Sequence, residues 1–183
     1  MKRTQNMALA ALLAALTALG AFLKIPTPIS AVSLQFFFTV AAGVLLGPGW
    51  GAASQGVYVG LGLIGLPIFT AGGGPAYLLH PTCGFLLGMI PAAAVVGQLC
   101  RTADTLTHRR VLLAGLAGLF VLYLVGLPYM YAVLNLYMGK NMSLWSLLRD
   151  GCLIFLPGDF GKLALAAWFL PGIQRRLKHE KQE

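Results

Sequence analysis

The stretch Cys152-Leu-Ile-Phe-Leu-Pro-Gly-Asp159-Phe-Gly-Lys162-Leu-Ala-Leu-Ala-Ala-Trp168 holds two opposite charges inside an apolar run long enough to cross a bilayer. A charge at the centre of a bilayer costs roughly 2.5–3.5 kcal/mol even on the mildest scale. Three-residue spacing puts Asp159 and Lys162 on one helix face, where they can neutralise each other. Because intramembrane ions are usually functional, the stretch predicts a polar site in a membrane protein. The alternative is a structural pair that fixes the last helix against its neighbours.

Composition predicts an all-α integral membrane protein. Of the 183 residues, 58% are hydrophobic and only 10% are charged, whereas an average soluble domain is about 25% charged. This length suits one compact unit, so residues 1–183 are expected to form a single six-helix transmembrane domain. The three cysteines are far apart and lack ligand spacing, so the sequence predicts neither a metal site nor another bound cofactor.

Six apolar segments approach the roughly 17–25 residues that a membrane-spanning helix needs. A Pro-Gly pair at 48–49 predicts a tight turn between the second and the third. The six predicted spans are Met7–Leu23, Ser33–Gly47, Trp50–Leu66, Cys83–Leu99, Val111–Leu134 and Gly151–Leu170.

Basic residues divide unequally between the two sides that these spans create. Because basic residues are enriched on the cytoplasmic side, the division predicts that both termini are cytoplasmic, in a multi-pass protein of the cell membrane. It also accounts for the basic excess without nucleic acid as a partner. One side holds nine (Lys2, Arg3, Arg101, Arg109, Arg110, Arg175, Arg176, Lys178 and Lys181), and the other holds three (Lys24, Lys140 and Arg149).

The segment Pro67–Thr82, on the predicted outer side, is long and rich in glycine and proline. Loops of this kind are often lids or binding loops. Within a triple glycine, Gly73 permits close approach of a ligand to the backbone, with a flexible turn as the alternative. The aromatic side chains of Phe69 and Tyr77 could form the wall of a pocket. His80 is a further candidate ligand group, although the sequence favours a structural hydrogen bond for it.

Asp159 and Lys162 together suit a ligand that carries both N–H and carbonyl groups. The carboxylate accepts hydrogen bonds from N–H groups, and the ammonium donates to a carbonyl or a carboxylate. Gln35 and Tyr58 are polar side chains at or within predicted spans, and they serve either as ligand contacts or as hydrogen bonds between helices.

The first predicted span carries small residues at four-residue spacing, namely Ala10, Ala14 and Ala18. Small residues let another helix approach closely, so this stripe predicts an outward-facing docking surface, with internal packing as the alternative. The sequence contains no nucleotide-binding motif. If the protein moves a solute by ATP hydrolysis, a partner must supply the ATPase.

From about Ile25 to Trp168 the chain resembles the BioY family, the biotin-specific substrate-binding (S) components of energy-coupling factor (ECF) transporters. Its final-helix Asp159 and Lys162 match the Asp and Lys of that family directly. The markers, in order, are Ile25-Pro-Thr-Pro28, Ser33-Leu-Gln35, Leu45-Leu-Gly47 with Trp50-Gly51, Tyr58, Gly65-Leu-Pro67-Ile-Phe69, Pro81-Thr82-x-Gly84-Phe85-Leu86 and Leu156-Pro157-Gly158-Asp159-x-x-Lys162.

The resemblance implies a six-helix S-component fold that binds biotin near its outer face. It also implies partners, a transmembrane T component and two ATPase subunits, with the alanine stripe of the first helix facing the T component. Two alternatives remain open. One is an S component for another vitamin or a biotin precursor, and the other is an integral-membrane enzyme that uses Asp159 as a general acid or base, with Lys162 or His80 as the second group.

Overall fold

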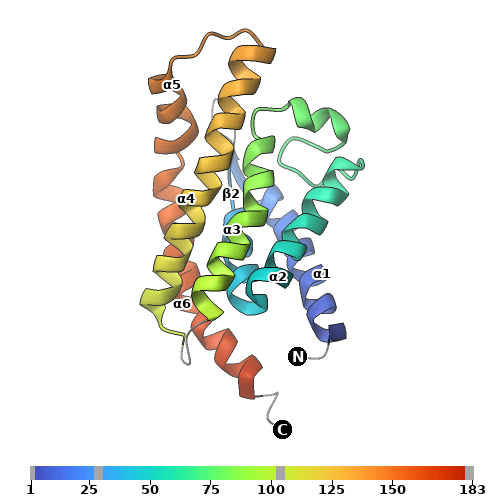
Figure 1. Ribbon diagram of the computed structural model, residues 1–183, viewed down its shortest axis with the longest axis vertical. Coiled ribbons are helices and arrows are strands. Elements are labelled where there is room, and N and C mark those ends of the chain that lie inside the picture. Colours follow the sequence, from blue (N-terminus) through green and yellow to red (C-terminus); the bar gives the residue numbers. More distant parts are fainter. Residues whose placement is uncertain (1–2, 27–30, 102–105, 180–183) are drawn as a thin grey trace.

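A computed structural model describes residues 3–26, 31–101 and 106–179, and these residues are almost entirely helical (Figure 1). The only sheet among them is a two-stranded antiparallel hairpin in which Lys24 pairs with Ser33. In chain order the elements are α1 (Arg3–Phe22), β1 (Lys24–Pro26), β2 (Ala31–Ser33), α2 (Gln35–Leu63), the short 3₁₀ helix η1 (Pro75–Leu79), α3 (Cys83–Arg101), α4 (His108–Ala132), the π-helical η2 (Val133–Tyr137), α5 (Leu144–Leu148), the π-helical η3 (Arg149–Leu153) and α6 (Leu156–His179).

Five helical stretches in the described residues are long and apolar enough to cross a membrane, so the predicted count of six is not confirmed. The difference lies in α2, which contains both the second and the third predicted spans. The remaining candidates agree with predicted spans to within several residues at their ends. The five stretches are Arg3–Phe22, Gln35–Leu63, Cys83–Arg101, His108–Tyr137 and Leu144–Leu177.

Helix α2 is sharply bent at Gly47, whose φ of 78° lies in the left-handed region that favours glycine. Hydrogen bonds join the two arms: Gln35 to Tyr58 at 2.6 Å, and Thr39 to Gln55 at 3.1 Å. In each pair the two residues are nearly equally far along the chain from Gly47, one before it and one after it. The second arm therefore runs back along the first. The turn predicted from the neighbouring Pro-Gly pair is therefore present.

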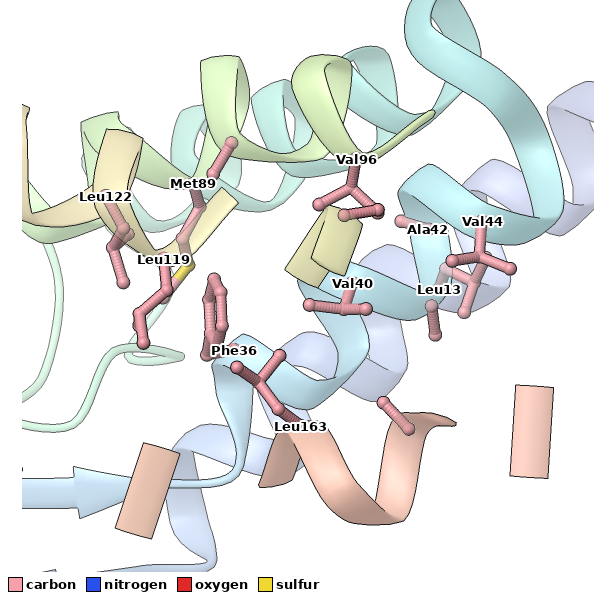
Figure 2. Close-up of a cluster of buried hydrophobic side chains, with 14 of the residues drawn as sticks. Leu13, Phe36, Val40, Ala42, Val44, Met89, Val96, Leu119, Leu122 and Leu163 are labelled. Atoms are coloured by element: carbon pink, nitrogen blue, oxygen red, sulfur yellow. The ribbon is translucent and has the colours of Figure 1, made fainter. Parts of the chain in front are cut away.

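The interior is apolar and lies between both arms of α2 and helices α3, α4 and α6. Figure 2 shows Phe36 and Val40 of α2 facing Met89 and Val96 of α3, with Leu163 approaching from α6. Large hydrophobic side chains also cover the outside of the helices, as expected for a protein surrounded by lipid. Examples are Leu113 (55% exposed), Phe120 (68%), Leu124 (60%), Leu165 (46%) and Trp168 (68%).

Helix α1 begins and α6 ends at the same end of the molecule, where α3 also ends and α4 begins (Figure 1). The β-hairpin and the loop that contains η1 lie toward the other end. Most of the basic residues that the sequence assigned to one side belong to these helix ends. Those in the described ranges are Arg3, Arg101, Arg109, Arg110, Arg175, Arg176 and Lys178.

Candidate ligand-binding site

The two charges of the final span form a buried ion pair. Asp159 lies in the first turn of α6, and Oδ1 of this residue is 2.5 Å from Nζ of Lys162. Only 4% of Asp159 and 8% of Lys162 is exposed. Pro157 fits this position because a proline lacks the N–H that the first turn of a helix leaves unpaired. A carboxylate in the first turn is also favoured by the helix dipole.

Neighbouring elements hold both partners of this pair. The hydroxyl of Tyr123, on α4, donates to Oδ2 of Asp159 at 2.6 Å. The ammonium of Lys162 donates to the carbonyl oxygen of Ser33, at the end of β2, at 3.0 Å. A carboxylate has about four acceptor positions and an ammonium three donors. Each ion therefore keeps capacity for a ligand after its protein contacts are made.

A cavity opens beside the ion pair, between β2, α2, α3, α4 and α6. The space between its walls, including a part open to solvent, is about 600 Å³. Its wall is mainly apolar and aromatic, with a few hydroxyl and amide groups and the two ions. The lining residues are Ser33, Gln35, Phe36, Thr70, Thr82, Phe85, Leu86, Met89, Leu122, Tyr123, Gly151, Phe155, Asp159 and Lys162.

Gln35 and Tyr58 are hydrogen-bonded to each other. Nε2 of Gln35 donates to the Tyr58 hydroxyl at 2.6 Å, and that hydroxyl donates to the carbonyl of Ile68 at 3.1 Å. The Ser33 hydroxyl donates to Oε1 of Gln35 at 2.6 Å. Gln35 lines the cavity, whereas Tyr58 is 1% exposed and lies behind it. These contacts use the Tyr58 hydroxyl and one of the two amide N–H groups of Gln35, so their clearest role is to fix the cavity wall.

The aromatic residues predicted in the outer loop pack on one another rather than lining the cavity. Phe69 contacts Tyr58 with a centroid separation of 5.5 Å and Tyr77 at 4.7 Å, and Tyr77 stacks on His80 at 4.8 Å. Phe69 is 2% and Tyr77 5% exposed. This aromatic cluster forms a layer behind the cavity, and the loop instead contributes Thr70 and Thr82 to the wall.

Hydroxyl groups connect that layer to the cavity. The hydroxyls of Tyr77 and Thr82 are 3.1 Å apart, and Thr82 Oγ1 is 2.7 Å from Nδ1 of His80. The Thr82 backbone N–H also donates to Nδ1 at 3.3 Å, which makes Nδ1 an acceptor and His80 neutral. Burial lowers the pKa of His80 and so favours this neutral state. The structural hydrogen bond that the sequence offered as the alternative for His80 is the one present.

Gly73 does not line the cavity. A Cβ atom at this position would lie 2.1 Å from the carbonyl oxygen of Leu66. The close approach that requires a glycine here is therefore between two parts of the same loop.

The expectation of an outward-facing alanine stripe on α1 is wrong for Ala10 and Ala14. They are only 6% and 4% exposed and pack inside the chain. The carbonyl of Ala10 accepts a hydrogen bond of 2.8 Å from Ser54 on the second arm of α2. Ala18 is half-buried, whereas Ala11 and Ala15, one position further along the helix, are exposed. Small side chains let α1 and α2 approach closely, which is the internal packing that the sequence left as the alternative.

Sequence reasoning missed Tyr123, Ser33, Thr70 and Thr82 as site residues. Tyr123 is one of three tyrosines in an otherwise apolar helix, and nothing in the sequence pairs it with a residue 36 positions away. An intramembrane polar group must find a partner, and this signal alone could have identified it.

Comparison with known proteins agrees with the fold and assigns the chain to a family. The model of the BioY family matches residues 1–179. The "Probable biotin transporter BioY" of Lysinibacillus sphaericus is 44% identical over 143 residues, which are 78% of this chain and 72% of that protein. The "Biotin transporter BioY" of Thermotoga maritima is 34% identical over 159 residues, 86% of this chain and 89% of that one.

Solved structures give the same answer for the fold. A crystal structure of the S-component for biotin from an ECF-type ABC transporter superposes with a TM-score of 0.80 at 26% identity, covering 96% of this chain and 95% of that one. A crystal structure of FolT bound with folic acid has a TM-score of 0.61 at 24% identity, with 92% of each chain covered, and shows the shared fold alone. Together the family match, the curated relatives and the fold show that this chain belongs to the BioY family.

Proposed function

We propose that this multi-pass membrane protein is the substrate-binding S component of an ECF transporter, and that it captures biotin from the outer side for ATP-driven uptake. The observation that carries this proposal is the buried Asp159–Lys162 pair at the wall of an otherwise apolar cavity. Family membership and the printed names of the relatives support the same substrate.

The chemistry of biotin matches the two ions. Its ureido ring carries two N–H donors beside one carbonyl acceptor. Asp159 retains acceptor positions beyond those used by Tyr123 and Lys162, and Lys162 retains one N–H beyond those given to Asp159 and Ser33. The sulfur-containing ring and the aliphatic chain suit apolar walls such as Phe36, Leu86 and Leu122, which line the cavity.

The orientation proposed for the protein has both termini in the cytoplasm of a cell whose plasma membrane it spans. The unequal distribution of basic residues supports it, because the helix ends on the basic side are where cytoplasmic loops are expected. If the two arms of α2 cross separately, the chain makes six crossings. The return of the second arm along the first supports that count.

The proposed partners are a transmembrane T component and two ATPase subunits. The chain carries no nucleotide-binding motif, so transport driven by ATP requires a separate ATPase. For the T component we propose the exposed side of α1, where Ala11 and Ala15 offer small side chains at four-residue spacing. Close helix approach in a membrane favours small side chains at the contact.

Calorimetric titration of the purified protein with biotin tests the proposed function. Saturable binding at one site per chain is expected, with riboflavin and thiamine as controls that should not bind. Tighter binding of either vitamin, or of dethiobiotin, would instead assign a different substrate to the S component. Absence of saturable biotin binding by folded protein would overturn the proposal. If bound biotin is recovered chemically altered, the membrane-enzyme alternative is favoured.

A further inference from the structure

Lys24 reaches the edge of the candidate cavity from a part of the chain far from the ion pair. It is the first residue of β1, and its ammonium donates to the backbone carbonyl of Thr70. Thr70 lines the cavity, and its hydroxyl lies 3.3 Å from that of Tyr77. A cation on a flexible, exposed side chain is therefore held next to the cavity wall.

The charges at this site leave Lys24 without a counter-ion. Among the residues that the structure describes, Asp159 and Lys162 are the only charged ones that line the cavity, and they pair at 2.5 Å. Within residues 3–26, 31–101 and 106–179, no carboxylate pairs with Lys24, whose one hydrogen-bond partner is a neutral carbonyl. The edge of the cavity thus carries one uncompensated positive charge, which favours a ligand with an anionic group.

The other polar donors at or near the cavity wall already make contacts within the protein. One of the two amide N–H groups of Gln35 donates to Tyr58, and the hydroxyl of Tyr58 donates to the carbonyl of Ile68. Lys162 is bound to Asp159 and to the Ser33 carbonyl, and its remaining N–H is the one proposed above for the ureido carbonyl. Lys24 needs to give up only a bond to a neutral carbonyl, and a hydrogen bond between two ions is stronger than the one it would replace.

We propose that Lys24 is a specificity-determining residue that binds the carboxylate of the ligand, while Asp159 and Lys162 bind its neutral polar end. This inference rests on the proposed function. Biotin has this two-ended form, with the ureido ring at one end and a carboxylate at the end of an aliphatic chain. The hydroxyl of Thr70, beside the same cavity wall, provides a second donor for the carboxylate.

The test compares biotin with biotinamide, which replaces the carboxylate by a neutral amide and keeps the ureido ring. Dissociation constants are measured by calorimetry for wild type, Lys24→Met and Lys24→Arg, with Lys140→Met as a control for the loss of one outer cation. Wild type should prefer biotin to biotinamide by roughly threefold to tenfold, the range for an ion pair that is partly solvated. Lys24→Met should remove this preference by weakening biotin binding alone, whereas Lys24→Arg and Lys140→Met should keep it.

Each outcome decides between the proposals. If Lys24→Met prefers biotin as strongly as wild type does, or weakens both ligands equally, the inference is wrong, because the residue then acts on structure rather than on the carboxylate. Binding of biotinamide by Lys24→Met shows that the variant is folded. If wild type binds neither ligand, the proposed function itself fails, and this result is distinct from a failure of the Lys24 assignment.

Discussion

The hydroxyl of Tyr123 on α4 lies 2.6 Å from Oδ2 of Asp159 on α6, while the other carboxylate oxygen of Asp159 holds Lys162 at 2.5 Å. The carboxylate is thus fixed from two directions before any ligand arrives. A site whose groups are already oriented loses less conformational freedom on binding. Tyr123 is therefore a positioning residue as well as part of the cavity wall.

Replacing Tyr123 by phenylalanine removes only the hydroxyl and should weaken biotin binding. A hydrogen bond to a charged group contributes about 1.5–3 kcal/mol, so a loss of roughly tenfold or more is expected, measured by calorimetry. Tyr131→Phe is the matched control, because Tyr131 lies on the same helix but is 37% exposed and is outside the cavity lining. Equal affinities of the two variants would show that Tyr123 does not orient the carboxylate.

The bend of α2 predicts opposite effects for two glycines in its second arm. A Cβ on Gly51 would lie 2.9 Å from the carbonyl of Ala42, whereas one on Gly56 would meet nothing within 4 Å. Gly51→Ala should destabilise the protein by about 1–3 kcal/mol through overpacking. Gly56→Ala should stabilise it by roughly 0.5–1 kcal/mol, since alanine is the better helix former. Thermal unfolding in detergent checks this, and the same shift for both variants would contradict the bend.

The outer loop Pro67–Thr82 is predicted to close over the site as a lid. Thr70 and Thr82 already contribute to the cavity wall, so a ligand in the cavity should restrict their motion. Hydrogen exchange of residues 70–77 should slow when biotin saturates the protein. The hydrogen-exchange rate of the loop between α4 and α5, measured in the same experiment, is the internal comparison. Unchanged exchange at 70–77 would assign an ordinary connecting role to this loop.

The two sides of α1 predict different results for neighbouring substitutions. Ala15→Trp places a bulky side chain on the exposed side, so it should leave biotin binding intact and reduce co-purification with the T component. Ala14→Trp instead places the same side chain in the interior, where Ala14 is 4% exposed, and should impair folding. Normal assembly and uptake with Ala15→Trp would place the docking surface elsewhere.

Most of the fold could be predicted from hydropathy and charge, because both are local properties of the sequence. The apolar runs predicted the positions of the long helices, and the Pro-Gly pair predicted the turn in α2. The Asp159–Lys162 pair was also predictable, since a spacing of three residues on one helix sets it.

The rest of the site depends on packing between distant segments, which no local pattern encodes. Tyr123 reaches Asp159 only because α4 and α6 lie side by side, and Lys24 reaches Thr70 only because a hairpin meets a loop. The four-residue spacing of alanines on α1 showed that small residues line up on the helix, but not whether they face the interior or the outside. Two parallel stripes, one with Ala14 and one with Ala15, satisfy the same spacing, and contact with α2 decides which is buried.

The most direct test of the central claim is the affinity of Asp159→Asn for biotin, measured by calorimetric titration beside wild type. The variant keeps the size of the side chain but loses its charge and one acceptor. We expect a loss of roughly 10–150-fold, corresponding to about 1.5–3 kcal/mol for a charged hydrogen bond in a buried site. Affinity within about twofold of wild type, in folded protein, would contradict the claim that this carboxylate recognises the ligand.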